Sequence, residues 1–341
     1  MKRAGATTKP NDLSIECSER GIKLLGSILS LDDTEGSDVS FVSAVSTPSG
    51  EIPKTNKTSQ VLATEETVRL LTRRGDKLNA LVCQYNRPFS IGRLKMELLP
   101  SGCVLGGASL YIEHGRKRIL YAPYLQTQRT NISRQMQLKR ADSLIIGAFH
   151  PDPSTSMPNR RKEKERLVSS VLKYLDQGLY PIIFCHEVGL AQEITKELTE
   201  MNVPLALHRS THRVNKIYEQ FGTKLGRYSL YDPRHTKNKV LIFPIPEHGR
   251  ARFKARLPNG PVIYVEGTLG KTDDPEASRH VYDRFFISET ADGKEVREII
   301  QAVSPKDVYV FGPYAKQYCQ ELKSISPKVH PLFVYGQPSL F

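Results

Sequence analysis

The sequence has no tryptophan and little cysteine. Its 5 cysteines are scattered along the chain, and no two of them form a C-x-x-C pair. An odd, widely spaced set of thiols argues against a disulfide framework and against a structural zinc knuckle. We therefore expect reduced, buried thiols and a reducing compartment, the cytoplasm or, in a eukaryote, the nucleus. The cysteines are Cys17, Cys83, Cys103, Cys185 and Cys319.

Long apolar runs are also missing. No stretch approaches the ~18 consecutive apolar residues of a membrane-spanning helix, so we expect no membrane partner. The opening residues, MKRAGATTKPND, are basic but no apolar segment follows them, unlike a secretory signal. We expect residues 1–12 to form a short flexible tail.

Acidic residues are outnumbered by basic ones. The chain carries 49 Lys and Arg against 36 Asp and Glu, for a net charge of +13 and a pI near 9.4. Such a balance is typical of proteins with a polyanionic partner such as nucleic acid, and also of basic proteins that are merely soluble. Composition leaves both interpretations open.

The local patterns alternate between strands and helices. Residues 64–74 have a capping Thr64, an acidic first turn and a basic last turn, which predicts a helix ended by Gly75. Residues 160–177 repeat apolar side chains at helical spacing. Short β-branched runs such as residues 39–43 and 142–146 predict buried strands. With 341 residues and 39% apolar content, we expect an α/β fold of one large or two ordinary domains.

Residues 98–125, LLPSGCVLGGASLYIEHGRKRILYAPYL, carry the most informative pattern. A turn at residues 100–102 precedes two glycines and then a hairpin over residues 108–121. This order resembles a block of the metallo-β-lactamase-fold nucleases, especially the mRNA 3′-end-processing and ligase-associated DNA exonuclease types. That block reads P-x-G-H-V-L-G-S-A-x-x-x-I … G-x-R-x-L-Y-T-G-D. The matching residues are Pro100, Gly102, Val104, Leu105, Gly106, Ala108, Ile112, Gly115, Arg118, Leu120 and Tyr121.

The metal ligands of that family are the part of the pattern that this chain lacks. In the family, H-x-H-x-D-H follows a strand like residues 39–43 and helps to hold two zinc ions and the attacking water. Here no H-x-H occurs anywhere, and Phe311-Gly312 stands where the family has His-Gly. The resemblance implies a fold kept without its metal site, so we expect no metal or other cofactor. The degenerate ligand positions are Ala44, Ser46, Pro48, Ser49, Cys103, Tyr124 and Thr290.

Further blocks follow in the family's order. Residues 181–193, 203–221 and 283–293 resemble its cap segment and its last metal-binding loop, in which Glu289 and Thr290 replace Asp and His. The resemblance implies an αββα metallo-β-lactamase-like sandwich with a small inserted β-CASP-like α/β cap. We expect residues 13–155 and 240–341 to form the sandwich, with a strand at residues 240–243 as the return point, and residues 156–239 to form the cap.

Other polar pairs are better explained as turns than as sites. Asp32 and Asp33 are turn formers, and His150 and Asp152 lie between prolines. We expect none of them to bind metal.

Two basic clusters are candidates for nucleic-acid contact. One opens the helix at residues 160–177 and includes Arg160, Arg161 and Lys162. The other is RARFKAR, with Arg250, Arg252, Lys254 and Arg256 around one phenylalanine, a pattern suited to an exposed strand that follows a phosphate backbone. The alternative for both is a solvated charged surface.

The hypothesis for function is a catalytically degenerate relative of these nucleases that binds nucleic acid, DNA or RNA, or a partner protein such as an active paralogue. Two alternatives remain: a hydrolase with a non-standard site, for example one built on Cys103 or on His150 and Asp152, and a structural subunit of a larger assembly. The final residues, QPSLF, also resemble the Q-L-[S/D]-L-F peptide by which bacterial DNA-processing proteins dock on the sliding clamp. Gln337, Leu340 and Phe341 are the candidate contacts, and packing of Leu340 and Phe341 on the fold is the alternative.

Overall fold

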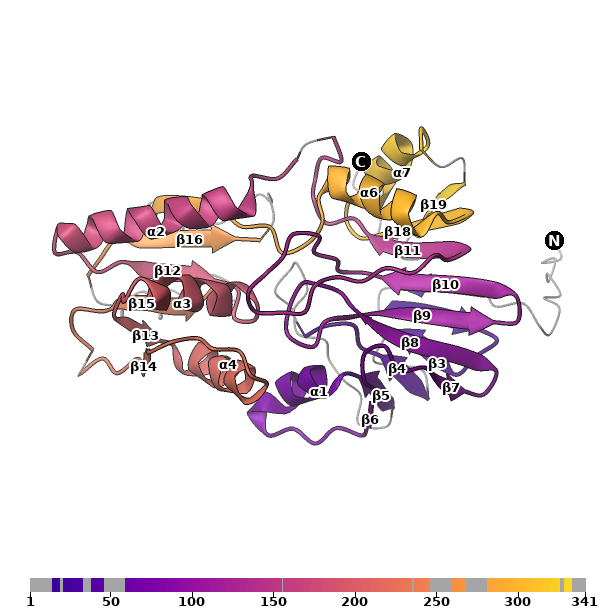
Figure 1. Cartoon of the computed structure of the whole chain (residues 1–341), viewed down its shortest axis with the longest axis horizontal. Helices are drawn as coiled ribbons and strands as arrows, with labels where there is room; N and C mark the ends of the chain where they lie inside the picture. The colour runs from indigo at the N-terminus through magenta and orange to yellow at the C-terminus, as the bar shows by residue number, and fades with distance from the viewer. Residues whose placement is uncertain are drawn as a thin grey trace, which may run out of the picture.

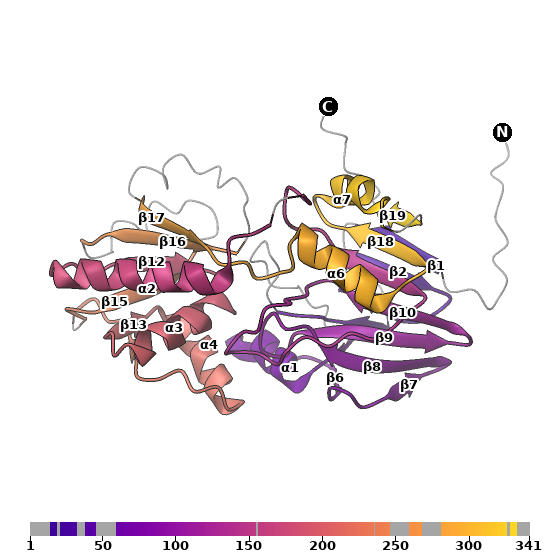
Figure 2. The same cartoon turned by 45° about the horizontal axis from the view of Figure 1, so that its top comes forward.

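Three sheets make up the fold of the computed structural model (Figure 1). The residues it describes are 14–18, 21–32, 38–45, 59–154, 156–234, 236–245, 259–267, 281–325 and 328–332. Two sheets stack into a sandwich, and the third lies beside it with its own helices (Figures 1 and 2).

The first sheet is built from the amino-terminal strands in chain order. β1 to β3 pair antiparallel, and β3 to β6 pair parallel. Its members are β1 (Ser14–Ser18), β2 (Gly21–Leu25), β3 (Leu29–Leu31), β4 (Val39–Phe41), β5 (Gln60–Ala63) and β6 (Ala80–Val82).

The second sheet joins strands from both ends of the chain. Its strand order is β19-β18-β11-β10-β9-β8-β7. The expected hairpin is confirmed, because β9 and β10 pair antiparallel with His114 opposite Lys117. The members are β7 (Phe89–Ile91), β8 (Leu94–Pro100), β9 (Ala108–His114), β10 (Lys117–Ala122), β11 (Ser143–Gly147), β18 (Asp307–Phe311) and β19 (Val329–Pro331).

Apolar side chains fill the space between these two sheets and the space beneath the outer helices. Leu24, Leu31 and Phe41 of the first sheet share one buried cluster with Leu98 and Leu110 of the second. On the outer face of the second sheet lie α6 (Gly293–Val303) and α7 (Ala315–Leu322), while α1 (Glu65–Leu71) and the short helix η1 (Thr72–Arg74) lie outside the first. These elements are the four layers of an αββα sandwich.

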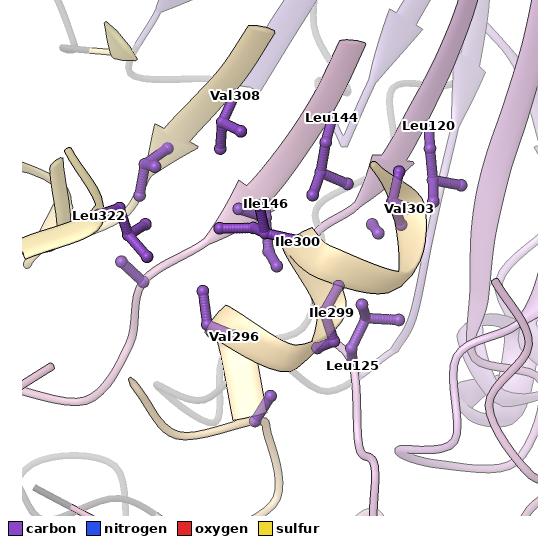
Figure 3. Packing of buried hydrophobic residues seen from close by; sticks show 14 of the residues in the cluster. Leu120, Leu125, Leu144, Ile146, Val296, Ile299, Ile300, Val303, Val308 and Leu322 are labelled. Carbon is purple, nitrogen blue, oxygen red and sulfur yellow. The ribbon is translucent and has the colours of Figure 1, made fainter. Parts of the chain in front are cut away.

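Helix α6 shows how sequence determines one of these layers. Val296, Ile299, Ile300 and Val303 recur at helical spacing and pack on Leu144 and its strand neighbours (Figure 3). Burial of each such side chain stabilises the fold by about 1.5–3 kcal/mol. Asp292 caps the helix by accepting from the Glu295 N–H, and the Glu295 carboxylate accepts from the Asp292 N–H in return.

The third sheet is wholly parallel and is inserted between β11 and β18, which pair directly with each other in the second sheet. Its strand order is β14-β13-β15-β12-β16-β17. The members are β12 (Ile182–Cys185), β13 (Leu205–Leu207), β14 (Ser229–Leu230), β15 (Val240–Pro244), β16 (Val262–Glu266) and β17 (Val281–Phe286). This inserted α/β unit is called the cap below.

The sequence predicts that the chain returns to the sandwich with the strand at residue 240. The structure corrects this expectation: β15 pairs with β12 and β13, and β16 and β17 continue the same sheet. The run Val240–Phe243 is apolar throughout, as a strand buried on both faces of a parallel sheet requires. That pattern fits either sheet, so it does not reveal which one the strand joins.

The cap carries three described helices: α2 (Arg160–Asp176), α3 (Leu190–Glu200) and α4 (Arg209–Gln220). α2 and α3 pack on the sheet through Leu167, Val171, Ile194 and Leu198. α4 lies beside α1 of the sandwich in both views (Figures 1 and 2). The architecture confirms the expected metallo-β-lactamase-like sandwich with an inserted α/β cap. No helix that the structure describes is long and apolar enough to cross a membrane.

Candidate functional site

Three of the matched ligand positions gather where the cap meets the sandwich, a region called the junction below. Ala44 follows β4, Cys103 lies in the turn after β8, and Tyr124 follows β10. All three belong to one apolar cluster, together with Val104 and Leu105 of the sandwich. Ser46, Pro48 and Ser49 lie outside the described residues. The structure therefore brings together side chains that are far apart in sequence, and those it brings together are mostly apolar.

Gly106 holds the turn that contains Cys103 against α1. Gly106 has a left-handed backbone (φ +77°), and its carbonyl accepts hydrogen bonds from the hydroxyls of Thr64 at 2.8 Å and Thr67 at 2.9 Å. A Cβ at this position would lie 2.6 Å from the Thr67 nitrogen, so only glycine permits the approach.

An aromatic stack occupies the next part of the junction. The Tyr124 ring lies 5.1 Å from Phe149, and Phe149 meets Phe311 edge-on at 6.0 Å. Tyr124 and Phe311 are two of the positions at which the family pattern has Asp and His. Aromatic rings at these separations attract one another, and neither side chain is among the Cys, His, Asp and Glu ligands that ordinarily bind zinc.

Cys103 is the matched position with a metal-binding atom, and its thiol is engaged elsewhere. Its Sγ donates to the Tyr124 carbonyl at 3.0 Å. Burial raises the pKa of the Cys103 thiol far above its ordinary value. The thiolate, which is both the nucleophile and the zinc ligand, is therefore disfavoured.

Thr290 is buried beside His150. The His150 Nε2 lies 3.2 Å from the Thr290 carbonyl oxygen and 3.3 Å from the Thr290 hydroxyl. Burial lowers the pKa of His150, so the ring is held neutral. Asp152 is exposed and accepts from the Ser154 N–H at 2.8 Å. His150 and Asp152 therefore have different partners, and each stabilises its own local structure.

Asp32 also serves the structure. Its carboxylate accepts from the Ser43 N–H at 2.8 Å and from the Tyr121 hydroxyl at 2.8 Å, which ties the end of β3 to both sheets. Asp33 lies outside the described residues.

A charged pair at the junction was not anticipated from the sequence. His186, just past the carboxyl end of β12, pairs through Nδ1 with the Glu289 carboxylate. Burial alone would lower the pKa of His186, but the charge and hydrogen bond of Glu289 raise it above its ordinary value. The position of His186 was the available signal, because side chains that bind ligands collect at the carboxyl ends of parallel strands.

Helix α4 covers the cluster from the cap side. Val214, Ile217 and Tyr218 are each at most 2% exposed and pack into the same apolar cluster as Ala44. The Tyr218 hydroxyl accepts a hydrogen bond from the Leu105 N–H at 3.2 Å. The junction is thus packed like a protein core.

The basic residues predicted to contact nucleic acid have different environments. Arg160 is 4% exposed and forms an ion pair with Glu193, so its predicted place on the contact surface is wrong. Arg161 is exposed and pairs with Glu165 at 2.9 Å, and Lys162 is exposed. Arg250, Arg252, Lys254 and Arg256 lie outside the described residues, as do Gln337, Leu340 and Phe341.

The donors present do not fit a two-metal site. Among the described residues there is no group of three or more His, Cys, Asp or Glu side chains arranged to hold a metal ion. Ala44, Tyr124 and Phe311 fill the matched positions with methyl and aromatic groups. A two-zinc centre needs several nitrogen, oxygen or sulfur ligands at once.

Comparison with known proteins gives distant relatives with names from nucleic-acid processing. The chain is 25% identical over 228 residues to a "Probable DNA ligase" of Opitutus terrae, covering 66% of this chain and 22% of that protein. It is 29% identical over 103 residues to an "RNase J-like protein" of Methanocaldococcus jannaschii, covering 30% of this chain and 24% of that protein. The second name agrees with the resemblance to metallo-β-lactamase-fold nucleases. No family model matches the chain.

The fold has a counterpart among solved structures. A protein of unknown function from Enterococcus faecalis V583 superposes with a TM-score of 0.60, covering 86% of this chain and 79% of that chain at 13% identity. This likeness shows a shared fold. The chain spans about a quarter of the length of each of the two curated relatives described above.

Proposed function

We propose that this chain is a catalytically degenerate relative of metallo-β-lactamase-fold nucleases that binds nucleic acid, or a partner in DNA or RNA processing, without cleaving it. The observation that carries the proposal is the apolar cluster at the junction. Ala44, Cys103 and Tyr124 occupy matched ligand positions, and α4 packs its buried face over them. A hydrolytic metal site needs ligands, water and an entry path in this place.

The alternative of a hydrolase with a non-standard site has less support. A Cys103 nucleophile needs a thiolate, and burial raises the pKa of this thiol. A site built on His150 and Asp152 needs both side chains together, whereas His150 is buried at Thr290 and Asp152 is exposed. A purely structural subunit remains the second candidate, and it differs from the first by having no affinity for nucleic acid.

Metal analysis and a nuclease assay on the same preparation test the loss of catalysis. We expect no stoichiometric zinc, and no cleavage of single-stranded or duplex DNA or RNA when manganese or zinc is added. Cys103→Ala should change neither result. Two bound metals per chain, or a cleavage that Cys103→Ala abolishes, would contradict the proposal.

Binding to nucleic acid should be independent of sequence and steeply dependent on salt. Each phosphate contact contributes about 0.7–0.9 to the slope of log affinity against log salt. The proposed contacts are Arg161 and Lys162 together with Arg250, Arg252, Lys254 and Arg256. Absence of binding at low salt would favour the structural subunit.

A protein partner is proposed through the carboxyl-terminal peptide. If Gln337, Leu340 and Phe341 dock on a sliding clamp, a variant that lacks residues 337–341 should lose clamp binding in a direct titration. Burial of the two apolar side chains supplies roughly 3–6 kcal/mol before ordering costs, which suits a weak tether. Equal binding by the full chain and the shortened chain would discard this contact. Pairing with an active nuclease paralogue is tested by co-purification of the two chains.

A further inference from the structure

The strongest unassigned feature of the surface lies where α1 and η1 of the sandwich meet α4 of the cap. Exposed arginines from both units are found here: Arg69 and Arg74 from the sandwich, and Arg209 and Arg213 from the cap. Within the described part of the chain, none of these residues forms an ion pair. We call these residues the junction arginines.

Helical spacing fixes the cap half of this surface. Arg209 and Arg213 are four residues apart, so they lie on one face of α4. The neighbouring face of the helix carries Val214, Ile217 and Tyr218 and packs into the apolar cluster shared with the sandwich, so the two arginines lie along the exposed edge of that buried face. The orientation of the arginines toward solvent is therefore set by the packing of the junction.

A fifth arginine, buried beneath the other four, shows that the two halves of the surface are close enough to act on each other. Arg73 is 7% exposed beneath the surface, and its Nε lies 3.6 Å from Glu187, its acidic partner. Burial lowers the pKa of Arg73 most, and the charges of Arg74 and Arg213 lower it further. Arg74 of the sandwich and Arg213 of the cap thus both act on one buried guanidinium.

The buried guanidinium group of Arg73 is incompletely satisfied by its neighbours. Two guanidinium nitrogens of Arg73, Nε and Nη2, are buried without a hydrogen-bond partner among the described atoms. Glu187 is the carboxylate that pairs with Arg73, while Arg74 and Arg213 add positive charge near the same guanidinium. An anion placed over Arg74 and Arg213 would gain attraction from all three, because Coulomb interactions are strengthened near a low-dielectric interior.

We propose that the junction arginines form a binding surface for the phosphodiester backbone of a nucleic acid, which crosses from the sandwich to the cap over the outside of the packed junction. Guanidinium groups hold phosphate oxygens in bidentate fashion, and a fixed spacing of such groups suits a repeating anion. This inference rests on the proposed function, since it assigns a surface to the binding. It differs from the basic clusters at α2 and at residues 250–256, which lie elsewhere in the chain.

A double charge reversal tests the surface. Binding of fluorescein-labelled oligonucleotides of mixed sequence is measured by anisotropy, with single-stranded and duplex DNA and RNA as separate arms. Arg74→Glu with Arg213→Glu should weaken binding by about tenfold or more and lower the salt slope by about 1.4–1.8, the loss of two phosphate contacts. Arg74→Lys with Arg213→Lys should retain most of the affinity.

The matched control reverses two exposed charges far from the junction, Arg116 in the β9–β10 turn and Lys316 on α7 (Figure 1). Both double variants change the net charge by the same amount, so equal losses would show a general charge effect and overturn the surface. Unchanged binding by the Arg74 and Arg213 variant would also overturn it, while the proposed function would stand. If the unmodified chain binds none of the oligonucleotides, the surface and the nucleic-acid part of the proposed function both fail. Competition by polyglutamate at equal charge would assign the surface to an acidic protein and overturn the nucleic-acid assignment.

Discussion

At the scale of single residues, a few polar contacts connect segments of the junction that are distant in the sequence. Cys103 donates to the carbonyl of Tyr124, Tyr218 accepts from Leu105, and His186 pairs with Glu289. The two members of each contact are at least 21 residues apart in the sequence. These interactions are the polar contacts that accompany the apolar packing of this region.

The His186–Glu289 pair makes the stability of the fold depend on pH. Because the pKa of His186 is raised in the folded chain, the folded state binds the proton more tightly. The contribution is fully present below the unfolded pKa of about 6.5 and is lost as pH rises through the folded pKa. Each pH unit that separates the folded pKa from the unfolded pKa contributes about 1.4 kcal/mol. The free energy of unfolding should therefore fall, relative to that of His186→Gln, as pH rises above about 6.5 and through the raised folded pKa.

Urea unfolding of the two proteins across this range measures the difference. Glu289→Gln is the control, because removal of the carboxylate leaves burial to lower the pKa of His186. That variant should lose the decline with rising pH. A constant difference between the unmodified chain and His186→Gln at all pH values would contradict the assignment.

At the scale of elements, α4 is held to the sandwich by a buried hydrogen bond as well as by apolar packing. Tyr218→Phe keeps the ring and leaves the Leu105 N–H buried without its partner, which should cost about 1–3 kcal/mol of unfolding free energy. Tyr231→Phe is the control, because no hydrogen bond of the Tyr231 hydroxyl is seen in the described part of the chain. Chemical denaturation measures both variants, and equal costs would show that the Leu105 contact contributes nothing.

Local signals predict most of the elements. Thr64 caps α1 as expected, the hairpin at residues 108–121 forms, and the apolar spacing of residues 160–177 produces α2. These features depend on interactions within a few residues, so sequence alone reveals them. The placement of β15 in the third sheet depends on its pairing with parallel strands that are distant in the sequence. An apolar run fits any buried parallel strand, so it does not predict which strands are its neighbours.

The candidate site was predictable only in part, for the same reason. The family resemblance points to Ala44, Cys103 and Tyr124, and the structure brings these positions into one cluster. The burial of Arg160 depends on Glu193, which lies on a different helix. Pairing between elements leaves no periodic pattern in either one, so neither this ion pair nor His186–Glu289 could be read from spacing.

At the scale of the whole molecule, the cap and the sandwich are joined by a buried apolar cluster. Interfaces between independent domains are usually more polar and allow relative motion. Here Val104 and Leu105 of the sandwich and Val214 and Ile217 of the cap share one core. We therefore expect the two units to unfold together, as one cooperative structure.

Hydrogen exchange measured by mass spectrometry tests this cooperativity. Ile217→Ala removes buried methyl groups at the junction and should cost about 2–5 kcal/mol. If the units unfold together, the slowest amides of β9 and β10 in the sandwich and of β12 and β15 in the cap should lose protection by the same free energy. Ile299→Ala, in the apolar core beneath α6 of the sandwich, should do the same, because a cooperative unit transmits the loss from any part of its core. If Ile217→Ala weakens the cap strands alone, or Ile299→Ala the sandwich strands alone, the cap opens independently. The junction would then be a closed but separable interface, and nucleic acid would have a route between the two units rather than over them.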